Sequence, residues 1–327
     1  MSGPRPTGLR RRALLSAALF APFAARAETW PSKPIRVILP APVGGLIDVA
    51  GRAISDTMQR ELGQPWMIDP RPGANGIMAG QMFLSAPSDG YTLFFTVSGI
   101  MALPFIMKVP FDTVADFKPI AMVGISTALL CVPPQSPANN VAEFVDYAKK
   151  NPGKLNYLNS GNGTGAHLLP ELLKIKYGLD VTSISYKGLP PGVQDLLANR
   201  LDLAMVSTTL VMQHVKAGRL KALAVIGPQR LPDLADVATM AEQGVGDIEV
   251  RSSLPLYGQK DLPTPIVERL NKAVAATLAD PDTRKRLEAA YIQPLSMTPA
   301  ETAEAMTREH DRLGAMIKQL GIKADGS

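Results

Sequence analysis

Short apolar runs alternate with segments of helical periodicity along most of the chain. Apolar runs of four to six residues predict buried strands, and apolar residues that recur every three or four positions predict helices. The predicted strands lie at residues 35–39, 66–68, 93–97, 128–132, 157–159, 182–185, 203–206 and 222–226. The predicted helices lie at residues 49–62, 77–85, 141–149, 167–177, 192–198, 265–279 and 299–320. This alternation predicts an α/β fold with parallel sheets covered by helices on both faces.

Two glycine-rich turns each stand between a predicted strand and a predicted helix. One is PAPVGGLID at residues 40–48, and the other is SGNGTGAH at residues 160–167. Such turns leave main-chain N–H groups unblocked at the positive end of a helix, which favours a carboxylate or a phosphate. The two turns together predict a pincer that holds a small anion from both sides. A P-loop is not predicted, because no lysine follows the second turn.

The positive charge of the chain is concentrated near its start. The formal net charge is +5, and residues 1–27 hold five arginines and no acidic residue, so the remainder is neutral. This distribution argues against a nucleic-acid partner. Three consecutive arginines, an apolar run at residues 13–25 and an Ala-Arg-Ala sequence predict a signal peptide over residues 1–27, cleaved after Ala27. We therefore expect export to the periplasm, by the Sec or the Tat route.

The metal-binding residue types are sparse. Cys131 is the single cysteine, which predicts neither an internal disulfide nor a thiolate metal cluster. His214 and His310 lack the spacing of zinc ligands. We expect no metal and no cofactor, and a protein that acts as a monomer.

Further motifs follow one another along the chain, beginning with WPSKPIR at residues 30–36 just before the first turn. The others are RPGANG at residues 71–76, APSDGYTL at 86–93, PGKLNY at 152–157, YKG at 186–188, QDLL at 194–197 and KAGRLKALA at 216–224. In this order they resemble the Bug-type (TctC-like) receptors, which are the periplasmic solute-binding proteins of tripartite tricarboxylate transporters. The resemblance covers nearly the whole chain after the predicted leader.

The resemblance implies a type II periplasmic binding protein, in which two α/β lobes joined by crossover strands hold the ligand in the cleft between them. We expect lobe 1 to comprise residues 28–125 plus 226–327, and lobe 2 to comprise residues 126–225. The second crossing falls near Gly227 or near Leu254, and the sequence does not choose between them.

The same resemblance implies a small organic carboxylate as the ligand, held largely through main-chain groups. Its partners would be the membrane subunits of a tripartite tricarboxylate transporter. Because receptors of this kind are often encoded far from a transporter, a sensor kinase is a second candidate partner.

The candidate ligand-binding residues come from both turns and from the ends of predicted strands. They are Pro42, Val43, Gly44, Gly45 and Asp48 in the first turn, Ser160, Asn162, Gly163, Thr164 and Gly165 in the second, and Ser98, Tyr186, Lys187 and Ser207 elsewhere. Asp48 either braces its turn or meets the ligand, and bracing costs less beside an anion. Lys187 could counter a carboxylate, although a lone lysine after a strand is usually solvated.

A periplasmic hydrolase is the alternative from a different class. It would use Ser160 or Ser98 as the nucleophile and His167 as the base, with an acid orienting the histidine. Ser160 has no G-x-S-x-G elbow around it, so we expect His167 to orient its loop or to pack rather than to catalyse.

Three stretches depart from the family pattern. Residues 100–102 lack the usual asparagine, residues 207–209 replace an Asp-Asn pair, and residues 251–253 stand where a tryptophan is common. The last two changes argue against an amino acid as the ligand and favour a ligand with more oxygen or negative charge. An aromatic carboxylate stays open as well, and it would depend on the aromatic residues Phe105, Tyr186 and Tyr257.

Overall fold

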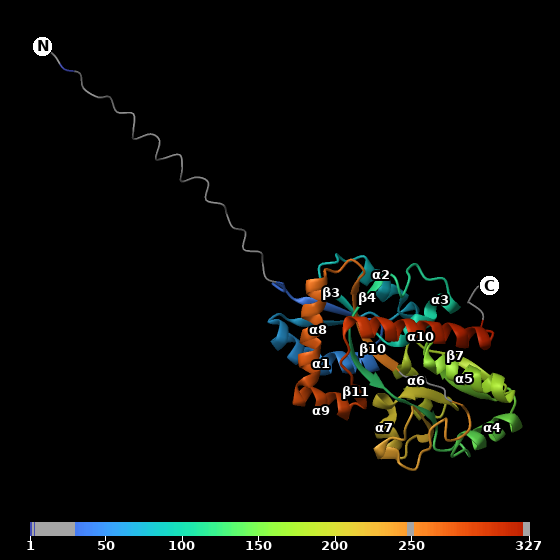
Figure 1. The fold of residues 1–327 in the computed structure, drawn as a ribbon. Helices are drawn as coiled ribbons and strands as arrows, with labels where there is room; N and C mark the ends of the chain where they lie inside the picture. The colour runs from blue at the N-terminus through green and yellow to red at the C-terminus, as the bar shows by residue number, and fades with distance from the viewer. Residues whose placement is uncertain (2, 4–29, 247–251, 323–327) are drawn as a thin grey trace.

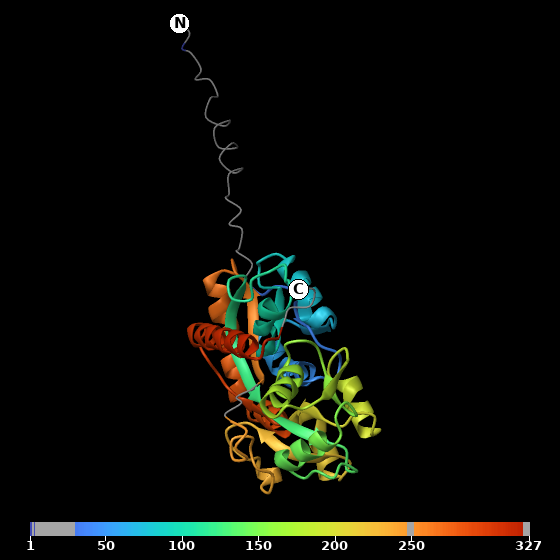
Figure 2. The same cartoon turned by 90° about the vertical axis from the view of Figure 1, so that its right-hand side faces the viewer.

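The computed structural model describes residues 30–246 and 252–322, together with Met1 and Gly3. Apart from those two residues, the predicted signal peptide lies outside the described part. Figure 1 shows two α/β lobes, the upper formed by the blue N-terminal and orange-red C-terminal parts, the lower by the green-to-yellow middle of the chain. Figure 2 shows the same division after a quarter turn. The predicted architecture of two α/β lobes is confirmed.

Lobe 1 is built on a six-stranded sheet. Its strands in spatial order are β11 (Ile292–Pro294), β4 (Phe117–Ser126), β10 (Ser252–Gln259), β3 (Thr92–Phe95), β1 (Ile35–Leu39) and β2 (Trp66–Pro70). β1 pairs in parallel with β2 and β3, as the alternation predicts, whereas β10 runs antiparallel to β3 and β4. The antiparallel pairs arise because β10 returns from lobe 2 and is not reached through a helical crossover within lobe 1.

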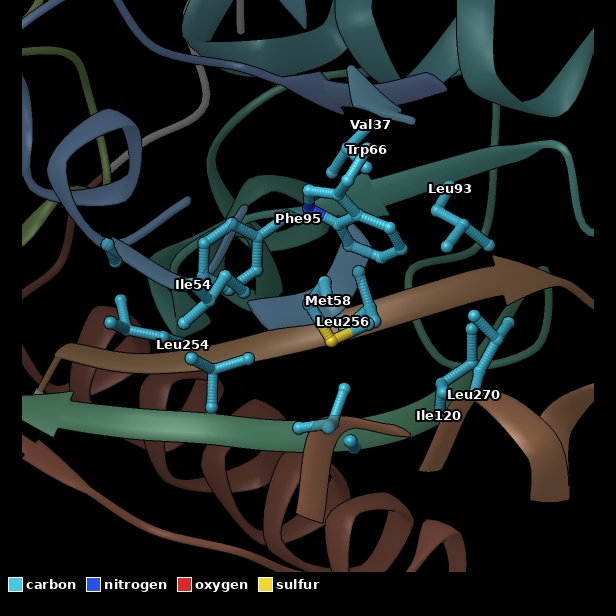
Figure 3. Packing of buried hydrophobic residues seen from close by; sticks show 14 of the residues in the cluster. Val37, Ile54, Met58, Trp66, Leu93, Phe95, Ile120, Leu254, Leu256 and Leu270 are labelled. Atoms are coloured by element: carbon cyan, nitrogen blue, oxygen red, sulfur yellow. The ribbon is translucent and has the colours of Figure 1, made fainter. Parts of the chain in front are cut away.

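Helices cover both faces of this sheet. They are α1 (Leu46–Leu62), α2 (Ile77–Leu84), α3 (Leu103–Ile106), α8 (Thr264–Ala279), α9 (Pro281–Ala289) and α10 (Pro299–Gln319), with the short 3-10 helices η1 (Ala74–Gly76) and η2 (Ser98–Ala102). The buried residues of α1 include Ile54 and Met58, which recur at helical spacing. Figure 3 shows them packed with Phe95, Leu254 and Leu256 of the sheet in the main core of lobe 1.

Lobe 2 contains a three-stranded sheet and a parallel strand pair. Its strands are β5 (Ala128–Val132), β6 (Leu155–Asn159), β7 (Val181–Ser185), β8 (Ala204–Ser207) and β9 (Lys221–Ile226), and its helices are α4 (Val141–Lys150), α5 (Gly165–Tyr177), α6 (Leu189–Leu197), α7 (Thr208–Lys216) and the 3-10 helix η3 (Pro232–Leu234). A bridge between Tyr157 and Leu203 connects the two groups of strands. Cys131 is fully buried in β5, and this burial raises the pKa of its thiol to about 12, as expected for an inert core thiol.

Two segments carry the chain between the lobes. The first is short, because β4 of lobe 1 leads through Thr127 directly into β5 of lobe 2. Before the chain returns, Thr239 bridges Val225 of β9, and Met240 and Val245 are buried in the core of lobe 2. We therefore propose that the second crossing follows Val245, near the later of the two positions that the sequence leaves open.

The described helices also bear on membrane insertion. In the ranges that the structure describes, no helix combines the length and the apolar character needed to cross a bilayer. The longest described helix, α10, begins with a capping box formed by Thr298 and Glu301, and several of its residues are exposed and charged.

Candidate ligand-binding cleft

A cavity of about 300 Å³ lies between the lobes. This volume is at the lower end of the range for small-molecule sites. Both glycine-rich turns reach it, one from each lobe. We call the turn at residues 40–45 loop 1 and the turn at residues 160–164 loop 2. The first residues of α1 and of α5, the helices that follow these loops, also line the cavity.

The two loops have the same backbone conformation where they enter their helices. Gly44 has φ +79° and is followed by Gly45 at φ −73° and ψ 167°. Gly163 has φ +78° and is followed by Thr164 at φ −70° and ψ 160°. A left-handed residue therefore precedes an extended residue in both loops, and glycine serves that position without steric cost.

Both loops are also braced in the same way. The Gly44 N–H donates to the Asp48 carboxylate at 2.8 Å, and the Gly163 N–H donates to His167 Nδ1 at 3.1 Å. Asp48 and His167 each occupy the third position of their helix. Asp48 is 2% exposed and is further paired with Arg52 at 2.9 Å. Of the two roles considered for Asp48, these contacts support bracing.

The bracing leaves the helix ends open toward the cavity. Neither helix has a side-chain hydrogen bond at its N-cap. The first-turn N–H groups of an α-helix have no partner within the helix, and they carry the positive end of its dipole. Leu46 and Ile47 of α1, and Gly165 and Ala166 of α5, line the cavity. Each lobe thus presents one helix N-terminus to the same space.

Hydroxyl and amide groups of loop 2 stiffen this half of the cleft. The Thr164 hydroxyl donates to the Gly161 carbonyl at 2.7 Å, so the Ser160 hydroxyl, 3.1 Å away, donates to Thr164. The Asn159 amide donates to the Asn162 side chain at 3.1 Å. Side-chain polar groups in loop 2 are therefore used largely to hold the loop itself.

Tyr186 and Lys187 approach the cavity from the end of β7. The Tyr186 hydroxyl donates to Asp195 at 2.7 Å, and burial together with this hydrogen bond raises the pKa of Tyr186 to about 12. A ligand could therefore contact the ring of Tyr186, whereas the hydroxyl is already bonded to Asp195. Lys187 is exposed at the cavity edge.

The structure brings most of the candidate residues together. The cavity is lined by Pro42, Gly45, Ser98, Ser160, Asn162, Gly163, Thr164, Gly165, Tyr186, Lys187 and Ser207. Val43, Gly44 and Asp48 are not among the lining residues, and the Val43 side chain is 65% exposed. Ligand contact by any of the candidates stays a prediction.

Sequence reasoning missed several lining residues. The largest group is a third loop at residues 72–76. It belongs to the RPGANG motif, which contributes to the family resemblance but was not predicted to bind the ligand. Others are Thr96, Ser252, Glu309 and Leu313, which carry no local signal in the sequence because they come from distant segments. Arg251, which precedes Ser252 in the stretch that departs from the family pattern, lies outside the described residues.

Glycines of lobe 2 meet side chains of lobe 1 across the cleft. A Cβ atom added at Gly161 would lie 2.3 Å from Asn75 Oδ1, and one at Gly163 would lie 2.3 Å from Ile106 Cδ1. The lobes therefore approach each other closely where these glycines stand. Loop 2 packs against the third loop and against α3 with no room for a side chain at either position.

Comparisons with known proteins show the family of the chain. The model of the tripartite tricarboxylate transporter family receptor, TctC, matches residues 50–322. The chain belongs to this family. A UPF0065 protein from the tcbD-tcbE intergenic region of Pseudomonas sp. (strain P51) is 32% identical over 322 residues, which is 97% of this chain and 96% of that protein. Protein BugT of Bordetella pertussis is 28% identical and covers 95% of both chains.

Three solved structures superimpose well on this chain. The periplasmic binding protein BugD gives a TM-score of 0.86 at 28% identity, over 90% of this chain and 100% of that one. The R. palustris protein Rpa4515 with adipate gives 0.86 at 30% identity, over 90% and 99%. MatC from Rhodopseudomonas palustris with bound malate gives 0.83 at 27% identity, over 88% and 99%. The predicted fold of a Bug-type periplasmic solute-binding protein is confirmed.

Proposed function

We propose that this TctC-family receptor captures a small organic carboxylate between loop 1 and loop 2 and delivers it to a tripartite tricarboxylate transporter. In this proposal the mature protein starts at Glu28 and works in the periplasm as a monomer. Each loop supplies half of the carboxylate site, and ligand binding draws the two lobes together by a hinge motion.

One observation carries the proposal. Two α-helix N-termini, one from each lobe, open onto one cavity without side-chain caps. Each helix end carries about half a positive charge, so the pair matches a single carboxylate. Main-chain N–H groups supply the hydrogen bonds, which explains how an anion could be held without an arginine among the described lining residues.

The solved relatives support the ligand class. Rpa4515 is described with adipate and MatC with malate, and both ligands are small carboxylates. The two structures cover 90% and 88% of this chain, which supports a carboxylate as the ligand class here.

A thermal-shift screen followed by calorimetry tests the proposal. The mature protein is unfolded, dialysed and refolded to remove any co-purified ligand, and is then screened against carboxylates, amino acids and neutral sugars. A ligand at about one hundred times its Kd stabilises the folded state by about 2.7 kcal/mol, which gives a clear rise in Tm. Selective stabilisation by carboxylates supports the proposal, and stabilisation only by another class contradicts it.

The transporter partner is tested separately. Uptake of the radiolabelled ligand into vesicles that hold the membrane subunits should require the receptor. If the receptor acts instead on a sensor kinase, ligand binding stays intact while uptake is independent of the receptor.

We propose no catalytic step in the cleft. His167 Nδ1 already accepts the Gly163 N–H within its own loop, and His167 is not among the cavity-lining residues. The Ser160 hydroxyl is directed to Thr164. A hydrolase would need this serine and this histidine to face one substrate, so the contacts favour a binding protein. Release of an alcohol or amine from ester and amide substrates by the purified protein would contradict this view.

A further inference from the structure

The charged side chains of the cavity are few. Among the described lining residues, Lys187 and Glu309 carry ionisable groups of opposite sign, so their formal charges cancel. Lys187 is exposed, and water screens its ammonium group. Beyond the two helix N-termini, the described walls therefore offer little positive charge to a second carboxylate.

The rest of the described lining is mostly apolar. Ile100, Leu103 and Leu313 of lobe 1 and Leu168 of lobe 2 line the cavity, and all four belong to one buried cluster that extends across both lobes. Met205 and Leu210 line it from the side of β8 and α7. A ligand body between these walls would lose its water and contact mainly apolar groups, together with uncharged side chains such as Ser98 and Ser207.

Glu309 stands at the edge of this apolar region. It lies four residues before Leu313 on α10, so both side chains point from the same face of that helix. Its carboxylate accepts two hydrogen bonds from Arg312, at 2.9 Å from Nε and 2.7 Å from Nη2. Arg312 itself is not a lining residue, so the acidic member of this pair is the one that lines the cavity.

The geometry points to a narrower ligand class, and this inference rests on the proposed function. We infer that the cleft selects a monocarboxylate with an uncharged, apolar body, and that Glu309 disfavours ligands with a second carboxylate. The helix N-termini neutralise one charge, whereas a second one would be desolvated beside apolar walls and a glutamate. This differs from the adipate and malate of the two solved relatives, each of which has two carboxyl groups.

The positions of the aromatic side chains bear on which ligands the cavity accepts. Phe105 packs on His310 at a ring distance of 4.7 Å, and Tyr257 is 1% exposed in the core. Neither is among the lining residues, which leaves Tyr186 as the aromatic residue of the described walls. The walls are mainly aliphatic, so aliphatic bodies should be accepted at least as well as aromatic ones.

Calorimetry with paired probes tests the inference. Hexanoate and adipate share a six-carbon chain, and benzoate and terephthalate share a ring, so each pair differs by one carboxylate. We expect the monocarboxylate of at least one pair to bind about tenfold or more tighter than its dicarboxylate, a difference of about 1.4 kcal/mol.

The outcomes separate this inference from the proposed function. The inference is overturned, and the carboxylate receptor left intact, if adipate, terephthalate, malate or citrate binds as tightly as the tightest monocarboxylate or more tightly. A refolded protein that binds no carboxylate of either kind overturns both.

The role of Glu309 is tested by Glu309→Gln, with Glu304→Gln as the matched control. Glu304 lies on the same helix and pairs with Arg308, but it is not a lining residue. Glu309→Gln frees the charge of Arg312, so adipate should bind about threefold or more tighter while hexanoate changes less than about twofold. Glu304→Gln should alter neither affinity. Unchanged adipate binding in a folded Glu309→Gln protein overturns the assignment to this residue.

Discussion

Substituting Gly163 by valine should weaken ligand binding more than it weakens the fold. Gly163 lies in loop 2 at φ +78°, and an added Cβ would lie 2.3 Å from Ile106 Cδ1 and 3.3 Å from Ala102 Cβ. Ile106 and Ala102 belong to lobe 1, whereas Gly163 belongs to lobe 2. The backbone strain is present in every state of the protein, but the overlap arises only when the lobes are together.

The two effects can be sized separately. Placing an L-residue in the left-handed region costs about 1–2 kcal/mol, which lowers the stability of the whole fold. Forcing extra methyl groups into a packed contact costs about 1–3 kcal/mol. If the second cost applies only to the closed form, it reduces the affinity for the ligand by about 5- to 150-fold.

Gly178→Val is the matched control. Gly178 ends α5 at φ +66°, in the same lobe, and no atom lies within 4 Å of the position its Cβ would take. Both variants should therefore lower the Tm of the ligand-free protein by similar amounts. In calorimetry with the tightest ligand from the screen, Gly163→Val should lose affinity while Gly178→Val keeps it.

Small-angle scattering adds a direct measure of closure. The wild-type protein should become more compact with ligand, and Gly163→Val should do so less. The reasoning is refuted if Gly163→Val binds as tightly as Gly178→Val, because the contact with Ile106 would then have no part in the ligand-bound state.

Three further substitutions examine the loop braces and the ring of Tyr186. His167→Ala should reduce affinity by less than about tenfold, since it removes one neutral hydrogen bond of about 1 kcal/mol, and complete loss of binding in a folded variant would assign His167 to the site. Asp48→Ala should lower the Tm more than His167→Ala does, because the hydrogen bond that Asp48 accepts from the Gly44 N–H has a charged acceptor. Equal Tm values for the two variants would contradict this. Tyr186→Phe should keep affinity within about threefold, because the hydroxyl donates to Asp195 and not to the cavity. The hydrogen bond from Tyr186 lowers the pKa of Asp195, so its stabilising effect is present at neutral pH and is lost as the pH falls through the lowered pKa. The Tm difference between wild type and Tyr186→Phe should therefore shrink at low pH. A Tm difference that stays constant with pH would contradict this.

Most of the regular structure could be predicted from the pattern of apolar residues. The strand at residues 128–132 has the predicted ends, and the helix at residues 299–320 ends within one residue of α10. The long strand β4 was not predicted, because Pro119 and Gly124 interrupt its apolar run. β10 was missed for the same reason, since Pro255 sits at an irregularity in its pairing with β4. β4 and β10 both adjoin a segment that connects the lobes, where pairing with distant strands overrides local propensity. The short strand β11 was not predicted either.

The two glycine-rich loops that line the cavity could be predicted from the sequence, because they depend on backbone conformation. Glycine at the left-handed positions Gly44 and Gly163 is a local requirement, and a local requirement leaves a signal in the sequence. Glu309 and Ser252 line the same cavity but come from segments that only the tertiary fold brings there. The departures from the family pattern favour a ligand with more oxygen or negative charge, whereas we infer a single carboxylate from the described walls. The two differ because the replaced residues alone do not report on the side chains around them.

The two halves of the cleft show how one anion site can serve receptors for different ligands. Loop 1 is braced by a charged aspartate and loop 2 by a histidine, yet the backbone dihedral angles at the helix entrances agree within 10°. The proposed carboxylate site would thus depend on backbone geometry that quite different side chains can maintain. Ligand choice must then come from walls outside the loops, such as Glu309 and Leu313 of α10. Exchanging wall residues between receptors should therefore change which carboxylate is bound while the two loops stay as they are.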